Sequence, residues 1–372
     1  MFFLVHFCIK ILKKPKKILI IIQRSNGDVF LSSNLISVLY KYYESPEIDL
    51  LVNEDTYSVA NLLPHINFIH QFSYKKKREN RWQQEKELIK NILRKYDLSI
   101  NLTASDRSVV YSLFASKRSI SAIEKDKLKS WWKRILLTYY YYFDANRHIL
   151  INNSEPLRCL QIEHKNVQNP PIISDDVISN VKKKLRDKRI NQYIIFHPSA
   201  QYNYKIYPES LRNKLLERLD ELGIPILITG SNNKIDLQIK KEIPKSSNIY
   251  NFIGKTTLEE YFALSQLSLA YIGMDTLNMH IAASQNKRIF AIFGPTKLSM
   301  WSPWSNILQK AAKNNEPMQS YDNITIFQSS SPCTVCGEVG CGSNHGKNEF
   351  PYVIKPEEIF KEVEKWYRNT KR

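Results

Sequence analysis

The sequence LSLAYIGMDTLNMHIAASQNKRIFAIFGP, residues 267–295, decides the fold. Its first apolar run ends at Gly273, and a segment of small residues separates it from a second apolar run at 289–293. This order predicts strand, turn, helix and strand, the repeating unit of a parallel α/β sheet. The polar residues between the first strand and the helix are Asp275, Thr276, Asn278 and His280. Because helix N-termini at strand ends present free N–H groups, we expect a phosphate-bearing ligand there.

The same alternation of strand and helix precedes this stretch. A predicted strand at 193–196 leads into a polar loop that contains Ser199 and Lys205, and a predicted strand at 226–229 ends at Gly230. In a parallel sheet these loops emerge at the same edge as Asp275. We therefore expect the second half of the chain to gather its polar strand ends into one site.

The first half begins with a run without alternation, residues 18–22, which is typical of a strand buried on both faces of a parallel sheet. Gly27 is expected to give the following turn a positive φ, and a helix is expected over 29–43. Asp28 is then either a simple helix cap or a functional carboxylate. The motif G-x-G-x-x-G is missing, so the pattern does not favour a dinucleotide site. Another predicted strand, 98–102, is followed by the polar segment that contains Arg107.

Length and charge limit the function. The 372 residues suffice for two domains, and the Pro-rich segment within 152–176 predicts their boundary. A formal net charge of +18 implies an anionic partner. Nucleic acid is not expected, because the chain has no helix-turn-helix, RNA-recognition or similar signature. The expected anionic partner is therefore a substrate or a membrane surface.

Two stretches have the composition of membrane-active segments. Residues 1–16 contain an apolar run far shorter than the ~20 residues that a spanning helix needs. The lysines follow that run, which is the reverse of a signal peptide, so the segment is either a surface anchor or a packed N-terminus. Residues 131–143, WWKRILLTYYYYF, form either a membrane-interface segment or a helix that covers a domain edge.

A cysteine-rich loop lies near the C-terminus. Cys333, Cys336, Cys341 and His345 have the spacing C-x2-C-x4-C-x3-H. Three thiolates and an imidazole suit a tetrahedral structural zinc site, and a reduced loop without metal is the alternative. Cys8 and Cys159 are isolated and predict no disulfide framework.

Four segments, in this order, resemble glycosyltransferase family 9, the lipopolysaccharide heptosyltransferase family. They are Arg24-x-x-Gly27-Asp28-Val29, HPSAQYNYKIYP at 197–208, IGKTTLEEYFAL at 253–264, and DTLNMHIAA with FGPT within 275–296. The resemblance covers most of residues 17–305. It implies an α/β GT-B fold, in which two Rossmann-like parallel-sheet domains face each other across a cleft. By this resemblance residues 17–165 bind the acceptor, residues 177–352 bind the nucleotide-sugar, and the helix at 355–372 packs back on the first domain.

The resemblance also implies the chemistry. Heptose passes from ADP-heptose to a lipopolysaccharide core acceptor with inversion and without a catalytic metal. Asp28 matches the general base and Lys205 the lysine that holds the diphosphate. The expected donor-binding residues are Ser199, Lys205, Gly230, Asp275, Thr276, Asn278 and His280. The expected acceptor-binding residues are Arg24, Asn26, Gly27 and Arg107. Because these groups lie in different domains, we expect domain closure to bring them together.

One departure from the family pattern concerns the donor sugar. Family members commonly have glycine after Asp-Ser/Thr, and here Leu277 stands in its place. Glycine allows a close approach of backbone to ligand, so another nucleotide-sugar is an alternative donor. A non-catalytic glycan-binding relative on the same fold is a separate alternative, against which the presence of both Asp28 and Lys205 argues. The acceptor implied by the resemblance is lipid-linked and anionic. This predicts a cytoplasmic protein bound peripherally to the inner membrane of a Gram-negative bacterium.

Overall fold

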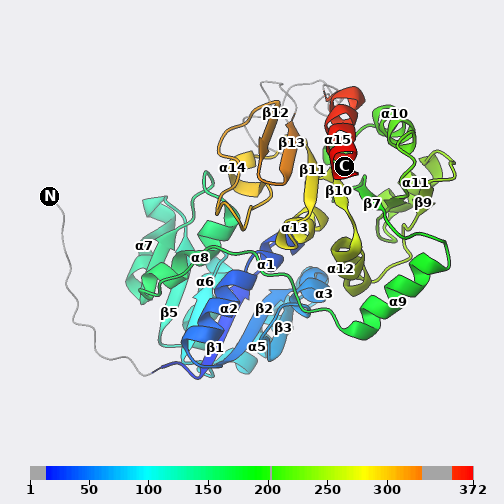
Figure 1. Cartoon of the computed structure of the whole chain (residues 1–372). Coiled ribbons are helices and arrows are strands. Elements are labelled where there is room, and N and C mark those ends of the chain that lie inside the picture. The colour runs from blue at the N-terminus through cyan, green and yellow to red at the C-terminus, as the bar shows by residue number, and fades with distance from the viewer. Residues whose placement is uncertain (1–13, 202, 329–353, 372) are drawn as a thin grey trace.

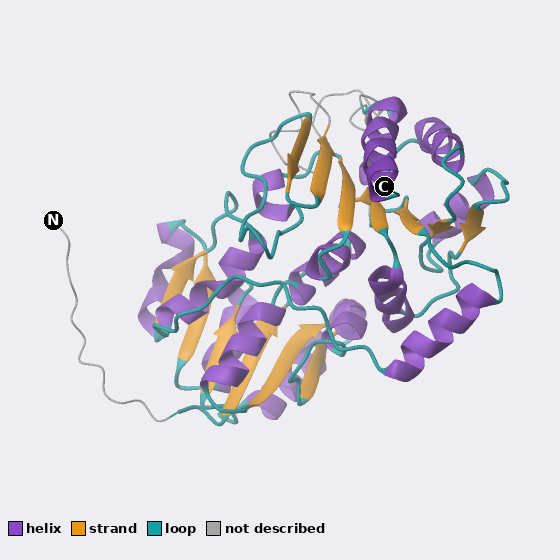
Figure 2. Ribbon diagram, viewed as in Figure 1, coloured by secondary structure: helices purple, strands orange, loops and turns teal. Residues whose placement is uncertain are grey.

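The computed structural model describes residues 14–201, 203–328 and 354–371. Two α/β domains lie side by side, each with a largely parallel sheet flanked by helices (Figures 1 and 2). All strands of the first sheet fall within residues 17–165, and all strands of the second fall within 177–352. The prediction of two Rossmann-like domains is thereby confirmed.

Six parallel strands form the first sheet in the order β3-β2-β1-β4-β5-β6. They are β1 (Lys17–Ile22), β2 (Glu47–Asn53), β3 (Phe68–Phe72), β4 (Leu98–Asn101), β5 (Ser119–Ile123) and β6 (Tyr139–Tyr142). Residues 18–22 are buried throughout, as their uninterrupted apolar run predicted. This strand order is that of a doubly wound fold, whose ligand site lies where the order reverses, here between β1 and β4.

Helices cover both faces of this sheet. They are α1 (Asn26–Phe30), α2 (Ser33–Tyr42), α3 (Tyr57–Ala60), α4 (Tyr74–Glu79), α5 (Arg81–Ile92), α6 (Asp106–Ala115), α7 (Lys127–Leu136) and α8 (Ile149–Cys159), with the 3-10 turn η1 (Glu54–Thr56). Leu19 and Ile21 pack with residues of α5 and α6, whereas Ile18 and Ile20 pack with residues of α2 and α8. Successive β1 side chains therefore serve opposite faces, as strand geometry requires.

The expected helix over 29–43 is interrupted. Helix α1 ends at Phe30, the Ser32 hydroxyl donates to the Val29 carbonyl oxygen at 2.7 Å, and α2 begins at Ser33. A serine that satisfies a backbone carbonyl in this way competes with helix continuation. The positive φ expected at Gly27 is also wrong, because Gly27 lies inside α1 and the turn is made by residues 23–25.

The second sheet repeats the first. Its order is β12-β13-β11-β10-β7-β8-β9, with β12 antiparallel at one edge. The strands are β7 (Ile194–His197), β8 (Ile226–Ile228), β9 (Ile249–Asn251), β10 (Ala270–Met274), β11 (Arg288–Phe293), β12 (Met318–Tyr321) and β13 (Ile324–Gln328). Residues 267–295 form β10, α13 (Leu277–Ser284) and β11, as predicted. The strand order reverses between β7 and β10, which is the expected ligand position.

The remaining helices surround this second sheet. They are α9 (Asp175–Arg186), α10 (Glu209–Asp220), α11 (Lys234–Glu242), α12 (Leu258–Leu267), α14 (Leu298–Trp301) and α15 (Pro356–Thr370), with the 3-10 turn η2 (Asn203–Lys205). We expected the last helix to pack on the first domain, and this is wrong. Ile359 and Val363 of α15 join the core beneath α10 and β11, and the Trp366 ring lies 5.8 Å from that of Phe290. The apolar stripe of α15 therefore covers the face of the sheet that α10 leaves open.

The carboxyl edges of the two sheets face each other, with α1 beside α13 (Figure 1). The Phe30 ring lies 5.7 Å from that of Phe262 across this interface. The chain between α8 and α9 strengthens the contact, since the Gln168 side-chain amide donates to the main-chain oxygen of His280 at 3.0 Å. The two domains thus share one apolar core.

Residues 131–143, which we expected to contact a membrane or cover a domain edge, form most of α7 and the edge strand β6. In the part of the chain that the structure describes, no helix has both the length and the apolar composition needed to cross a bilayer. The other candidate, within residues 1–16, lies almost wholly outside the described residues, which begin at 14.

Candidate active site

A cavity of about 580 Å³ lies where the two carboxyl edges meet. The loop after β1 lines one wall, and the loops after β7, β8 and β10 line the other. All the residues expected to bind the donor line this cavity: Ser199, Lys205, Gly230, Asp275, Thr276, Asn278 and His280. Its volume is within the range of roughly 300–1,000 Å³ that small-molecule sites occupy.

A cation and a helix N-terminus lie together in the cavity. The Lys205 ammonium, carried by the turn η2, is 3.1 Å from a carboxylate oxygen of Asp275, and both side chains are largely buried. Helix α13 begins two residues later, with Thr276 as its N-cap. The free N–H groups of that helix and the ammonium both favour a negatively charged ligand. This arrangement suits a diphosphate.

His280 lies on α13, one turn into the helix. Burial lowers its pKa to about 4, the neighbouring Asp275 carboxylate opposes this shift, and Lys205 adds to it. The imidazole is therefore neutral near pH 7. Its Nδ1 is buried and has no hydrogen-bond partner among the described residues. A neutral ring with an unused nitrogen can hydrogen-bond a ligand without carrying charge.

His197, the last residue of β7, forms a second polar centre in the cavity. The Asn278 side-chain amide lies 2.9 Å from its Nδ1, and the Thr229 hydroxyl lies 3.1 Å from the same atom. Burial lowers the pKa of His197 as well. These contacts hold Asn278 at the cavity wall. His197 was not among the predicted site residues, although its position at a strand end, two residues before Ser199, is a signal that could have identified it.

The loop after β8 is held by a buried carboxylate. One Asp236 oxygen accepts from the Ser231 hydroxyl at 2.8 Å and from the Asn233 side-chain amide at 3.0 Å. A Cβ atom at Gly230 would lie only 3.0 Å from Asp236 Cγ. Any larger residue at 230 would thus push the Asp236 side chain aside by a few tenths of an ångström. We predicted Gly230 as a site residue but not its partner Asp236.

The first domain already reaches this cavity. Ser25, Asn26 and Gly27 line it, and a Cβ atom placed on Gly27 would lie 3.8 Å from His280 Cδ2, an ordinary contact distance. We expected domain closure to bring the two halves together. In this structure they are in contact, because α1 and α13 pack directly against each other.

Asp28 does not line the cavity. Its carboxylate accepts from the Ser25 hydroxyl at 2.6 Å and pairs with Arg24 Nε at 2.8 Å. Together with a bond from the Ser25 backbone N–H, this is the capping arrangement of α1. The helix-cap interpretation of Asp28 is thus what the geometry shows directly, and its role as a base stays a prediction.

The two arginines expected to bind the acceptor also lie outside the cavity. The Arg24 guanidinium stacks over Phe143 at 4.6 Å. Arg107 stacks over Phe72 at 3.8 Å and donates to the Tyr74 hydroxyl at 3.2 Å, beyond the carboxyl end of β4. Nearby, Gln23 is buried with neither side-chain amide atom hydrogen-bonded. Gln23 follows β1, where the strand order reverses, and was not among the predicted site residues.

The predicted zinc ligands Cys333, Cys336, Cys341 and His345 lie outside the described residues. Within the described ranges, no group of three His, Cys, Asp or Glu side chains is placed to hold a metal ion. The zinc site therefore stays a prediction from sequence spacing.

The family model described as glycosyltransferase family 9 (heptosyltransferase) matches residues 86–329 of the chain. The chain belongs to glycosyltransferase family 9. It is 27% identical over 312 residues to lipopolysaccharide heptosyltransferase 3 of Escherichia coli K12, which covers 80% of this chain and 88% of the relative. It is 30% identical over 116 residues to lipooligosaccharide heptosyltransferase 2 of Haemophilus influenzae, about a third of each chain. The family predicted from the four motifs is confirmed, and this family 9 chain is a transferase.

Solved structures support the fold of this family 9 transferase. A family 9 glycosyltransferase of Veillonella parvula matches with a TM-score of 0.71 at 17% identity, covering 94% of this chain and 96% of that one. The E. coli ADP-heptose lipopolysaccharide heptosyltransferase II matches with a TM-score of 0.70 at 17% identity, covering 96% and 100%. An E. coli heptosyltransferase solved with ADP has a TM-score of 0.67. The expected GT-B fold is confirmed.

The buried histidines make the stability of this family 9 transferase dependent on pH. The pKa of His280 is about 4, against about 6.5 in an unfolded chain. Between these values the unfolded state binds more protons, so stability is full above pH 6.5 and falls as the pH drops toward 4. We expect His280→Gln to flatten this fall by up to about 1.4 kcal/mol per pH unit, the slope for one proton. Urea unfolding at a series of pH values measures it, and an unchanged slope would contradict the assignment.

Proposed function

We propose that this chain transfers a heptose from ADP-heptose to a lipopolysaccharide core acceptor, with inversion at the anomeric carbon. The proposal rests on the cavity in which Lys205 and the N-terminus of α13 meet the loop after β1 of the other domain. The donor lies against the second domain and the acceptor against the first. Relatives named heptosyltransferases, and structures solved with ADP and with an ADP-heptose analogue, support this choice of donor.

The donor half of the site stabilises the leaving group. As the bond from the anomeric carbon to the diphosphate oxygen breaks, negative charge grows on the departing ADP. Lys205 and the N–H groups at the start of α13 are placed to meet that charge. The neutral imidazole of His280 and the amide of Asn278 complete the wall with hydrogen-bonding groups. With positive charge supplied in this way, the proposed reaction requires no catalytic metal.

Asp28 is the proposed base. Its carboxylate takes the proton of the acceptor hydroxyl while that oxygen bonds to the anomeric carbon from the face opposite the diphosphate. In the structure the carboxylate is bound by Ser25 and Arg24. The mechanism therefore requires the acceptor to displace one of these contacts, and Arg24, whose side chain lies within reach of Asp28, is placed to bind the acceptor's anionic groups once it moves.

The acceptor side of the first domain is basic. Helix α4, which contains three lysines and one arginine, has no buried residue and follows β3 at the carboxyl edge of the sheet. Its Tyr74 hydroxyl accepts a hydrogen bond from Arg107, which joins the helix to the segment after β4. The exposed cations of this surface are Lys75, Lys76, Arg78 and Arg81, and Lys77 is partly exposed. Phosphates and acidic sugars of a core oligosaccharide fit such a surface, and a lipid-linked acceptor places the protein on the cytoplasmic leaflet of a Gram-negative inner membrane.

Leu277 does not require a change in backbone geometry. It is the first residue of α13, lines the cavity and is absent from the residues with positive φ. A glycine is thus unnecessary for the turn itself, and the leucine side chain only narrows the space beside the donor. A transferase for another nucleotide-sugar is the second candidate, and the observation that favours it is this side chain.

Replacing Lys205 tests the donor site. We expect Lys205→Met to bind ADP about 10–100-fold more weakly, because it removes a charge-assisted contact with the diphosphate. Calorimetry with ADP, UDP and GDP measures the affinities. The matched control is Lys214→Met, which breaks a 2.6 Å ion pair with Glu357 away from the cavity. Equal ADP affinity in the parent and in Lys205→Met would overturn the donor assignment, and tighter binding of UDP or GDP would favour the second candidate.

Replacing Asp28 tests the base. We expect Asp28→Asn, which retains an oxygen for the Ser25 contacts, to lower kcat by about 10²–10⁴. Stability should fall as well, because the Arg24 guanidinium loses its charged partner, so kcat is compared for folded protein. The measurement is mass-spectrometric detection of heptosyl transfer from ADP-heptose to a delipidated core acceptor. Asp126→Asn is the matched control, because Asp126 caps α7 outside the cavity. Turnover of Asp28→Asn at the parent rate would show that Asp28 acts only as a helix cap.

A further inference from the structure

Helix α7 has an unusual orientation. Leu128, Trp131 and Ile135, spaced to share one face of the helix, are 87%, 61% and 72% exposed. An amphipathic helix in a globular protein ordinarily turns its apolar face toward the core. Here that face is exposed. Helix α7 lies at the outer margin of the first domain (Figure 1).

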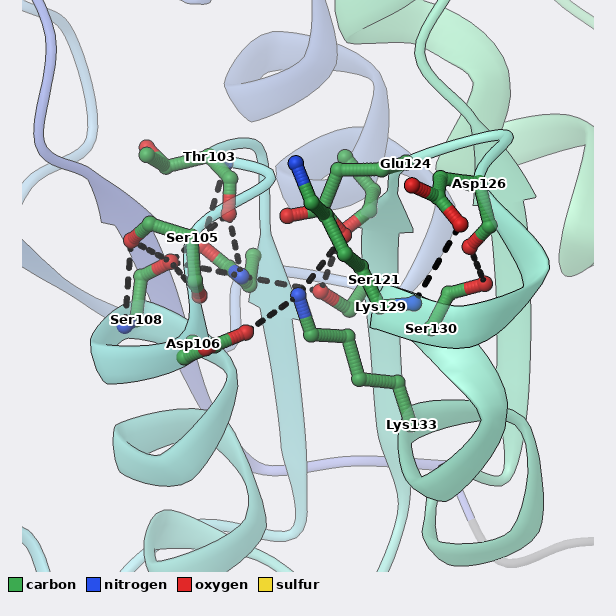
Figure 3. Close-up of polar contacts among 12 residues, drawn as sticks. Thr103, Ser105, Asp106, Ser108, Ser121, Glu124, Asp126, Lys129, Ser130 and Lys133 are labelled. Atoms are coloured by element: carbon green, nitrogen blue, oxygen red, sulfur yellow. Dashed lines mark hydrogen bonds and ion pairs between the residues drawn. The ribbon is translucent and has the colours of Figure 1, made fainter.

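A buried lysine fixes this orientation. Lys133, on the inward side of α7, is fully buried, and its ammonium lies 2.6 Å from a carboxylate oxygen of Asp106 and 2.6 Å from one of Glu124 (Figure 3). At the start of the helix the Ser130 hydroxyl donates to the main-chain oxygen of Asp126 at 2.6 Å. Turning the apolar face inward would break both of these ion pairs and the packing of the lysine side chain. The outward apolar face is therefore part of the fold.

The apolar surface continues onto the neighbouring edge strand. Tyr140 and Tyr142 of β6 are exposed, with their rings 5.8 Å apart, and the Arg134 guanidinium of α7 lies 5.6 Å from the Tyr142 ring. Tyr141 points to the opposite side of the sheet and is buried. We define the α7 face as Leu128, Trp131, Ile135, Leu136, Tyr140 and Tyr142.

Cations flank the α7 face. At 100° per residue, Lys127 and Arg134 lie on one side of the apolar arc of α7 and Lys129 lies on the other. The lysines are exposed, and so is Lys125 just before the helix. An apolar and aromatic face bordered by lysine and arginine is the composition of helices that lie in the interface of an anionic membrane.

We propose that the α7 face docks on the surface of an anionic lipid bilayer, with α7 lying in the plane of the headgroups. The proposal deepens the proposed function, since a lipid-linked acceptor requires the first domain to work at such a surface. Charge decides against a second copy of the chain as the occupant. A two-fold contact through this face would oppose Lys127, Lys129 and Arg134 to the same three cations of the partner.

Vesicle co-sedimentation of the full chain tests this docking. The vesicles are phosphatidylethanolamine with phosphatidylglycerol, and phosphatidylcholine alone, which is zwitterionic with no net charge, is the reference. We expect Leu128→Ser with Ile135→Ser to weaken binding to the anionic vesicles by about tenfold, because two side chains no longer enter the interface. The matched control is Ile172→Ser with Ile307→Ser, which removes two side chains that are 95% and 66% exposed elsewhere. The control should bind as the parent does.

Three results would overturn the proposal: no binding by the parent, equal binding by the α7 variant, or a parent dimer that the variant dissociates in buffer without vesicles. The last result would assign the face to a subunit interface. Transfer to a delipidated acceptor is measured in parallel and should be the same in the parent and the variant. If the parent lacks that activity with every donor, the proposed function fails, while the vesicle result stands on its own.

Discussion

The pairing of β10 with β7 is the interaction on which the site depends. Both strands are parallel members of one sheet, so their carboxyl ends bring His197 and Asp275 to the same edge. The approach is close: a Cβ atom at Gly273 would lie 2.4 Å from the His197 carbonyl oxygen. Only glycine fits there, and the loops that follow the two strands are held at a fixed separation. The position of the cavity thus depends on the register of β10 with β7, which Gly273 permits.

That geometry determines the electrostatics. The ammonium of Lys205 reaches Asp275 from the loop after β7, and α13 adds the free N–H groups of its first turn. Burial keeps His280 neutral beside this ion pair. The described donor wall therefore carries its positive charge on one lysine and one helix end, while its histidines supply hydrogen bonds. In the proposed transfer, positive charge and hydrogen-bond donors both stabilise the departing diphosphate. The order of the strands places these groups at one edge of the sheet.

The strands and the position of the site could be predicted from the sequence. Buried parallel strands appear there as uninterrupted apolar runs, and the polar residues that follow them mark the site. Residues 18–22 and 267–295 are examples. The features that were missed depend on tertiary contacts. The helix break at Ser32 accompanies a hydrogen bond from its hydroxyl to the Val29 carbonyl oxygen. Helix α15 packs on the second domain, against apolar residues that α10 does not cover. The contact between Gly230 and Asp236 joins residues six positions apart. The capping role of Asp28 was foreseen only as an alternative.

The central claim is that a nucleotide diphosphate binds between the loop after β1 and the N-terminus of α13. A crystal structure of the protein with ADP tests it most directly. We expect the diphosphate to lie within hydrogen-bonding distance of Lys205 Nζ and the first N–H groups of α13, with His280 in contact with the ligand. A diphosphate bound elsewhere, or one that makes no contact with Lys205 Nζ, would contradict this claim.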